Sequence, residues 1–277
     1  MSGNVPKAQF GLIGGSSTFS IDFPLALEWD GLNILVEEKI FETPFGASPP
    51  FKLFKIGDRQ VLTCKMHGWR SGVSRADASR QIFWVFREAG VKRVLAEGGV
   101  GAINHLLKPR DIVVPHDYID FSMRKDTSLD SPYLLMMREA LCPEMRQLLY
   151  HGMEQMSGRR VFDRGVYVVT DGRHFESPAE VNMFKISGGD IVGQSLCPEV
   201  YLTREIGACY ARIDMVVNYA EGVVKDWEHQ ELKDIFYDES KNIARILLET
   251  ISNLPAEPRC SCRELRKPTL LKEVGSE

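Results

Sequence analysis

The chain alternates between short apolar runs and longer amphipathic segments. The apolar runs are rich in β-branched residues and lack strict alternation with polar residues, which is typical of strands covered on both faces. We predict strands over 8–15, 60–66, 91–99, 111–119, 165–172, 190–195 and 211–220. The segments between them have helical periodicity and predict helices over about 74–89, 143–156, 178–187, 198–206 and 227–252. This alternation predicts an α/β fold with one mixed, mostly parallel twisted sheet flanked by helices.

Length and charge narrow the class of protein further. A chain of 277 residues suits one α/β domain, and we expect a C-terminal extension from about residue 254. The net charge is −4 with both signs interspersed, so no basic stripe for nucleic acid is present. No apolar run approaches the roughly 20 residues of a membrane span, and the N-terminus does not resemble a signal peptide. We therefore expect a cytoplasmic protein that binds neither nucleic acid nor membrane.

The six cysteines do not predict a disulfide scaffold, because a core of this size needs no covalent staples. Four of them stand singly among apolar neighbours and are expected to be small core residues: Cys64, Cys142, Cys197 and Cys209. Cys260 and Cys262 form a C-x-C pair, whereas zinc sites usually combine C-x₂₋₄-C with a second pair elsewhere. No metal site is expected, and a disulfide between these two stays an alternative to reduced thiols.

Polar and glycine-rich motifs follow most of the predicted strands. These motifs are GGSS, HGWRSG, EGGVG, HFES, QS and NYAEG. In parallel sheets, ligands bind outside the carboxyl ends of the strands. The sequence therefore predicts one composite site built from several loops.

Two of these motifs are candidates for binding an anion. The segment GLIGGSS (11–17) lacks the spacing of a dinucleotide loop, but its turn could offer backbone N–H groups and the hydroxyls of Ser16 and Ser17 to an anion. His67 and Arg70 could add an imidazole and a guanidinium. The alternatives are a purely structural turn, and a solvated arginine beside a core histidine.

Two other motifs could recognise a purine. Phe175 offers a stacking face and Glu176 an acceptor for a ring N–H, although Glu176 could instead cap the helix that follows. Asn218 ends an apolar strand with a carboxamide, which presents a donor and an acceptor that can pair with O6 and N7 of a 6-oxopurine. The alternative is that Asn218 only forms a turn.

The order of these motifs resembles that of the trimeric nucleoside phosphorylase family, closest to methylthioadenosine phosphorylases and 6-oxopurine nucleoside phosphorylases. The resemblance covers about residues 10–255, and the tail LPAEPRCSC is similar to the C-x-C ending of some microbial methylthioadenosine phosphorylases. It is carried by GLIGGSS, ETPFG, HG, the glycine run 98–101, LKPRDIVVPHDYID, GRHF, PEVYLTREIGACYA and MVVNYAEG.

The resemblance implies a glycosyltransferase of purine salvage, in which phosphate attacks the anomeric carbon of a purine nucleoside. The products would be the free base and a sugar 1-phosphate, with inorganic phosphate as co-substrate and no metal or organic cofactor. It also implies a homotrimer or a dimer of trimers. A neighbouring subunit's segment near Tyr133–Met137 would then close the 5′ side of the pocket.

The family's site residues map onto matching positions of this chain. The implied phosphate-binding residues are Ser16, His67, Gly98, Gly99 and Ser195, with Arg70 as a nearby cation. The implied nucleoside-binding residues are Phe175, Glu176, Gln194, Asn218 and Ala220, and the implied catalytic residues are His67, Glu176 and Asn218. The Glu176 and Asn218 pair matches 6-oxopurine enzymes, and Ala220 stands where adenine-type enzymes carry an aspartate. The resemblance thus favours inosine, guanosine or 5′-methylthioinosine.

Departures from the family pattern lie on the phosphate side. Met66 stands where the family has an arginine, and Arg70 or Lys65 would have to supply the charge. Glu97 precedes Gly98, and a carboxylate beside a phosphate site repels a dianion. Three functions stay open. We favour a phosphorylase with a rearranged anion site over a nucleoside hydrolase in which Glu97 or Glu176 orients water, and a nucleoside-binding protein without catalysis is third.

Overall fold

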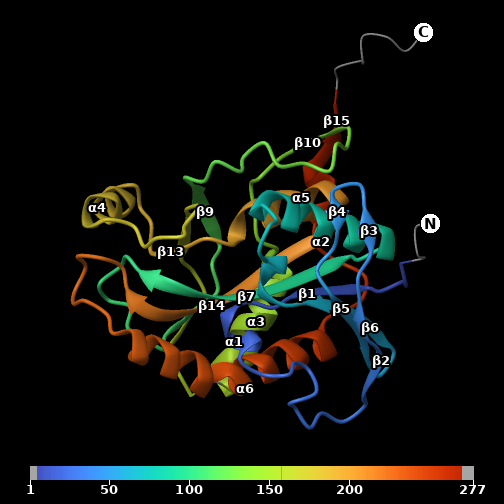
Figure 1. Cartoon of the computed structure of the whole chain (residues 1–277), viewed down its shortest axis with the longest axis horizontal. Helices are drawn as coiled ribbons and strands as arrows, with labels where there is room; N and C mark the ends of the chain where they lie inside the picture. Colours follow the sequence, from blue (N-terminus) through green and yellow to red (C-terminus); the bar gives the residue numbers. More distant parts are fainter. Residues whose placement is uncertain (1–4, 157, 270–277) are drawn as a thin grey trace.

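A computed structural model describes residues 5–156 and 158–269 and is built around one large sheet (Figure 1). The sheet has 11 strands, and its main path runs in the order β11-β8-β14-β7-β1-β6-β5-β2, with β13, β12 and β9 attached beside β7. Its strands are β1 (Phe10–Ile13), β2 (Leu32–Lys39), β5 (Phe51–Ile56), β6 (Arg59–Cys64), β7 (Arg93–Ala102), β8 (Ile112–Val113), β9 (Asp117–Asp120), β11 (Val161–Phe162), β12 (Val166–Val169), β13 (Ile191–Gly193) and β14 (Cys209–Tyr219).

The centre of the sheet is parallel, as predicted. β1 pairs in parallel with both β6 and β7, and β14 pairs in parallel with β7 over most of its length. Toward one edge, β5 pairs antiparallel with β6, and the edge strand β2 pairs antiparallel with β5. The predicted fold class, a mixed and mostly parallel sheet flanked by helices, is confirmed.

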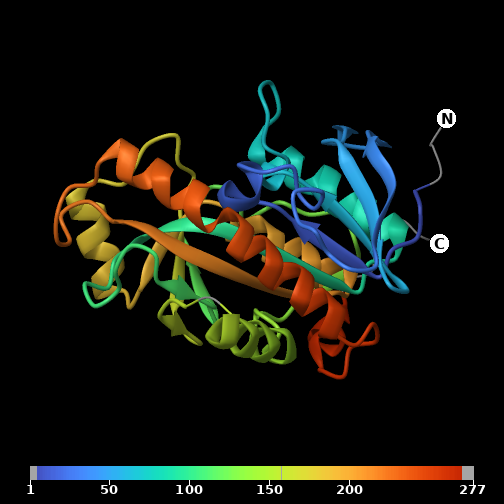
Figure 2. The same ribbon diagram turned by 90° about the horizontal axis from the view of Figure 1, so that it is seen from below.

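Helices cover both faces of the sheet (Figures 1 and 2). Helices α2 and α5 contact each other on one face, whereas α1 and α3 contact the long helix α6 on the other. The helices are α1 (Ser16–Phe19), α2 (Arg75–Ala89), α3 (Pro143–Met156), α4 (Pro178–Ile186), α5 (Leu196–Ile206) and α6 (His229–Asn253). All five predicted helices are present. Within residues 5–156 and 158–269, no helix is both long and apolar enough to cross a membrane.

Several features of the sheet differ from the sequence-based predictions. Strands β5 and β11 were not predicted, and the predicted strand 111–119 is divided into β8 and β9. Strand β2 was not predicted, because its residues alternate between exposed and half-buried positions at an edge rather than forming a buried apolar run. The strand predicted over 91–99 was expected to end in the glycine run 98–101, but β7 continues through this run to Ala102. Short strands also form two small sheets, one of β3 (Glu42–Thr43) with β4 (Gly46–Ala47) and one of β10 (Tyr133–Leu135) with β15 (Arg266–Pro268).

A close contact between Gly11 and Phe86 fixes the distance between α2 and the central strand β1. Phe86 is fully buried, and a Cβ atom on Gly11 would lie 2.7 Å from its Cζ atom. Because that separation is far below van der Waals contact, the helix can pack at this depth only where the strand carries no side chain.

We predict that Gly11→Ala lowers the free energy of unfolding by about 1–3 kcal/mol, because the added methyl group overpacks the core. Phe86→Leu makes room for that methyl group, so the double variant Gly11→Ala/Phe86→Leu should lose less stability than the sum of the two single variants. Denaturant unfolding of the three variants measures this coupling. Additive losses would show that the two residues do not determine this spacing.

Candidate active site

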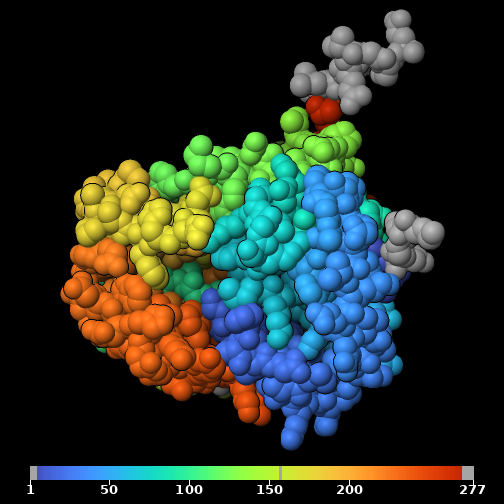
Figure 3. All heavy atoms as spheres, viewed as in Figure 1, coloured from blue at the N-terminus to red at the C-terminus, as the bar shows by residue number. Residues whose placement is uncertain are grey.

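The predicted site residues converge on a cavity of about 220 Å³ at the carboxyl ends of the strands. In Figure 3 a hollow is visible between the orange and yellow segments on one side and the blue and cyan segments on the other. The cavity takes residues from β7, from the segments that follow β1, β6, β12, β13 and β14, and from α6. The predicted site residues that line it are Ser16, His67, Gly98, Gly99, Phe175, Glu176, Gln194, Ser195, Asn218 and Ala220.

Arg70 is the predicted phosphate-binding residue that the structure places elsewhere. It lines a second cavity of about 670 Å³, on the other side of the segment that contains Met66 and Trp69. Its guanidinium donates to the carbonyl oxygens of Gly68 and Ala47 and to the side chain of Gln81. Lys65 lines the same second cavity. This cavity is larger but contains none of the purine-reading residues, so the smaller one is the candidate active site.

The turn after β1 binds an anion, but that anion is a side chain of the protein itself. β1 and β7 pair Ile13 with Ala96, so Glu97 lies beside the turn. The Glu97 carboxylate accepts hydrogen bonds from the backbone N–H groups of Gly15 (2.5 Å), Ser17 (3.3 Å) and Thr18 (3.0 Å), and from the Thr18 hydroxyl (2.8 Å). The expectation that this turn offers these donors to a bound ligand is therefore wrong. Ser16 still faces the cavity.

Position 15 has to be a glycine, because both β7 and His67 lie very close to its backbone. A Cβ atom at this position would lie 2.2 Å from the backbone oxygen of Glu97 and 2.9 Å from Nε2 of His67. Even the smallest side chain at this position would push the turn away from Glu97 or displace the imidazole.

A buried hydrogen-bond relay orients His67. Its Nδ1 lies 2.7 Å from a carboxylate oxygen of Glu199 in α5, and the hydroxyl of Tyr210 donates to the other oxygen at 2.7 Å. A carboxylate next to Nδ1 keeps the proton on that nitrogen. Nε2 is therefore the ring atom available to a ligand. Burial, aided by Glu199, raises the pKa of Tyr210 well above its ordinary value, so Tyr210 stays a neutral donor.

A buried guanidinium lies directly behind the anion side of the cavity. Arg212 in β14 is fully buried and pairs with Asp214, with Nη2 at 2.5 Å from the carboxylate. The same nitrogen donates to the hydroxyl of Ser195 at 3.0 Å. Burial alone would lower the pKa of Arg212, but the Asp214 carboxylate holds this pKa well above its ordinary value. Arg212 is therefore charged. Ser195 accepts from it, so the Ser195 proton can be donated either to the Tyr167 hydroxyl, with which Ser195 also bonds, or to a ligand.

Gly98 and Arg212 are matched in shape. A Cβ atom on Gly98 would lie 2.7 Å from Nη2 of Arg212. The guanidinium thus fills the space that a side chain at position 98 would occupy. Arg212 can therefore lie here only because residue 98 has no side chain.

The opposite end of the cavity offers groups that suit a purine. The rings of Phe175 and Trp227 pack with centroids 4.6 Å apart. Glu176 is buried and accepts from the Thr170 hydroxyl at 2.5 Å. The alternative that Glu176 caps α4 is wrong, because Ser177 is the N-cap and forms a capping box with Glu180.

Asn218 lies inside β14, next to an irregularity in its pairing with β7, rather than in a turn. Its amide nitrogen donates to the carbonyl oxygen of Tyr219 at 2.7 Å. This bond fixes the orientation of the amide, leaving its oxygen and one N–H for a ligand.

Several residues at or beside the cavity were not found from the sequence. Arg212 and Asp214 interrupt the apolar run of β14, and two charges inside a buried strand were a usable signal. Glu199 and Tyr210 gave no comparable signal, because only the packing of α5 against β14 brings them to His67. Leu232 and Phe236 of α6 cover the cavity, as does Glu221 after β14.

Comparisons with known proteins agree with this geometry. The sequence pattern of the phosphorylase superfamily matches residues 10–252. The 6-oxopurine nucleoside phosphorylase of Pyrococcus furiosus is 31% identical over 94% of this chain and 98% of its own length. The S-methyl-5′-thioadenosine phosphorylase of Thermofilum pendens is 31% identical over 92% of this chain and 96% of its own.

A solved structure shows the same architecture. The methylthioadenosine phosphorylase from Schistosoma mansoni, in complex with adenine, superimposes with a TM-score of 0.74 at 25% identity. The alignment covers 93% of this chain and 96% of the other. With a matching sequence pattern over most of its length and the same architecture, the chain belongs to the phosphorylase superfamily and is an enzyme of its purine nucleoside phosphorylase type.

Proposed function

We propose that the protein cleaves the N-glycosidic bond of a 6-oxopurine nucleoside with phosphate, giving the free base and a sugar 1-phosphate. The observation that carries this proposal is that one cavity holds both sets of groups the reaction needs. Phe175, Glu176 and Asn218, to which we assign recognition of the base, line it together with Ser16, His67 and Ser195, to which we assign binding of the nucleophile. No single element supplies both sets, so their convergence depends on the whole sheet.

The base-reading groups support a 6-oxopurine. The Glu176 carboxylate can accept from N1–H, which a 6-oxopurine carries and a 6-aminopurine lacks. The Asn218 amide can then donate to N7 or O6. Hydrogen bonds that strengthen as negative charge develops on the leaving purine stabilise the transition state more than the ground state.

The nucleophile side supports phosphate bound in a rearranged site. Ser16 and Ser195 remain available as donors, since the hydrogen bonds of Glu97 engage other atoms of the turn. Nε2 of His67 can accept from the hydroxyl of a hydrogen phosphate. Arg212 acts through Ser195 and is a positioning residue. Because Arg212 is already paired with Asp214, the pair adds no net charge, and it serves to keep Ser195 oriented as a donor.

Hydrolysis is the second candidate, because Glu97 occupies donors that an anion would otherwise use. Glu97 itself does not suit the role of general base. It is 1% exposed, and its oxygens accept four hydrogen bonds. Activation of water would fall to Glu176, whose place at the base end of the cavity suits recognition of the purine better.

The remaining properties stay predictions. We infer a homotrimer or dimer of trimers in the cytoplasm, formed from one domain with an extension after about residue 254. Tyr133–Met137 does not line the cavity of its own chain, so this segment would have to close the 5′ side of a neighbouring copy.

The proposed function predicts faster base release from inosine, guanosine and 5′-methylthioinosine than from 5′-methylthioadenosine, each measured with saturating phosphate. Omission of phosphate should reduce the rate with every substrate, because no other nucleophile is positioned. Faster release from the 6-aminopurine would contradict the assignment of Glu176 and Asn218. Release that is indifferent to phosphate would favour hydrolysis.

We expect Asn218→Asp to lower kcat/KM for inosine by about 10- to 100-fold, because a donor to the leaving base is replaced by an acceptor. The inosine-to-adenosine ratio should fall, since a protonated carboxyl group or a 6-amino group can restore a hydrogen bond. Asn218→Ala is the control, because it removes the donor without adding an acceptor. An unchanged ratio in Asn218→Asp would mean that Asn218 does not read the base.

Met66→Arg tests the nucleophile side by adding a cation to the cavity, which Met66 lines. A guanidinium near Ser16 and Ser195 should lower the KM for phosphate by roughly tenfold while changing the KM for inosine little. Met66→Gln has comparable length without the charge and should leave the KM for phosphate near that of the wild type. Equal effects of the two substitutions would contradict a phosphate site next to Met66.

A further inference from the structure

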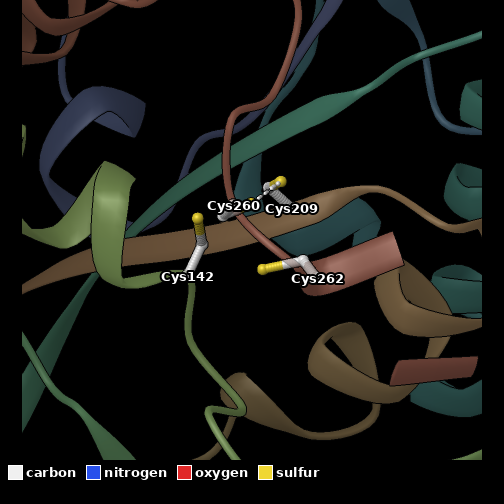
Figure 4. A group of neighbouring side chains, drawn as sticks. All are labelled: Cys142, Cys209, Cys260 and Cys262. Carbon is white, nitrogen blue, oxygen red and sulfur yellow. Dashed lines mark hydrogen bonds between the residues drawn. The ribbon is translucent and has the colours of Figure 1, made fainter. Parts of the chain in front are cut away.

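Four of the six cysteines lie together at the end of β14 that is remote from the active site. β14 carries Cys209 as its first residue and Asn218 near its last. Cys142 directly precedes α3, and Cys260 and Cys262 belong to the segment after α6. Figure 4 shows the four side chains on these three segments, close to one another.

The separations of the sulfur atoms suit a single metal ion. All four Sγ atoms lie within 4.8 Å of one another, and those of Cys209 and Cys260 are 3.2 Å apart. Zinc bound by four thiolates has Zn–S bonds of about 2.3 Å, which places the sulfurs of the tetrahedron about 3.8 Å apart. The separations between the sulfurs would need to change by up to about 1 Å to reach that arrangement. Two disulfides would need only two close pairs, not four mutually close sulfurs.

The backbone holds the three segments in place without help from the sulfurs. The N–H of Cys142 donates to the carbonyl of Tyr210 at 2.7 Å, and the N–H of Cys209 donates to that of Lys92 at 2.9 Å. The carbonyl of Cys262 accepts from the guanidinium of Arg204 at 2.9 Å. The four thiols are therefore arranged by the fold, as a pre-formed ligand set requires.

A buried positive charge lies next to the cluster. Arg204 is 3% exposed, and its guanidinium donates to the carbonyl oxygens of Cys262 and Glu139. Within residues 5–156 and 158–269, no carboxylate forms a salt bridge with it. A buried charge of this kind requires a counter-charge. A zinc tetrathiolate carries a net charge of −2 and would provide one beside Cys262.

We propose that Cys142, Cys209, Cys260 and Cys262 bind one zinc ion as a structural tetrathiolate site. Binding replaces the four thiol protons by one Zn²⁺, with no change of oxidation state. The sequence did not indicate this site, because the C-x-C pair finds its partner pair in two isolated cysteines 67 positions apart. Cys142 and Cys209, which were expected only to fill the core, would then also be zinc ligands.

The zinc site would hold the C-terminal segment on the body of the protein. Beyond Cys262, the N–H of Met136 donates to the carbonyl of Leu265 at 2.8 Å, and β15 pairs with β10. The guanidinium of Arg266 lies 4.4 Å from the ring centroid of Tyr133. Release of the ion would therefore loosen both β15 and β10.

The test is the zinc content of the full-length protein purified without chelators. We expect about one zinc per chain, lost on acidification because protons compete for the thiolates. Cys260→Ser/Cys262→Ser should contain almost no zinc and show faster amide exchange in β10 and β15. Cys64→Ala, which removes a buried cysteine outside the cluster, should keep the full zinc content.

A second measurement does not depend on the folding of the variant. Wild-type protein, stripped of metal and reduced, should bind one cobalt(II) ion and show the intense visible bands of a tetrahedral cobalt tetrathiolate. The proposal is overturned if the purified protein lacks zinc and the reduced protein gives no such bands. It is equally overturned if iron replaces zinc, or if denaturation without reductant exposes only two free thiols, because the four cysteines would then form two disulfides.

Discussion

The active site depends on the capture of the Glu97 carboxylate by the turn after β1. A buried carboxylate is costly unless hydrogen bonds replace its hydration, and here three backbone N–H groups and one hydroxyl do so. The interaction ties the end of β1 to β7 at the centre of the sheet. It also fixes the turn against which His67 rests. The hydrogen bonds between Glu97 and this turn therefore determine the position of the imidazole, although His67 takes no part in them.

This constraint links several residues on the anion side of the cavity. With Glu97 in the turn, Ser16 and Ser195 are hydroxyl donors left on the anion side of the cavity. Arg212 of β14 donates to the Ser195 hydroxyl and holds it in place. Its guanidinium has room there only because residue 98 is a glycine. Asp214 holds the guanidinium in place.

Much of the fold and of the cavity could be predicted from the sequence, because continuous apolar runs identify central strands and their carboxyl ends identify the site. The edge strand β2 could not be found in this way, since its pattern alternates. The placement of Arg70 was wrong because adjacency to His67 says nothing about side-chain direction. The segment turns at Met66 and His67, which both have positive φ, and Arg70 then points into the neighbouring cavity.

Long-range partners were the least predictable part of the molecule. Glu97 is 82 positions from Gly15, and His67 is 132 positions from Glu199. Each of these residues has an ordinary alternative interpretation when considered alone. Only the register of the sheet and the packing of α5 decide which of them meet, and neither is encoded in a local motif.

The source of the oxygen atom that becomes bonded to the anomeric carbon tests most directly whether phosphate or water is the nucleophile. The enzyme would be incubated with inosine and phosphate in ¹⁸O-labelled water, and the sugar product analysed by ³¹P NMR and mass spectrometry. A phosphate held by Ser16, His67 and Ser195 predicts ribose 1-phosphate without label from the water. Free ribose carrying ¹⁸O at the anomeric carbon would contradict it, and would mean that Glu97 has displaced phosphate from this site altogether.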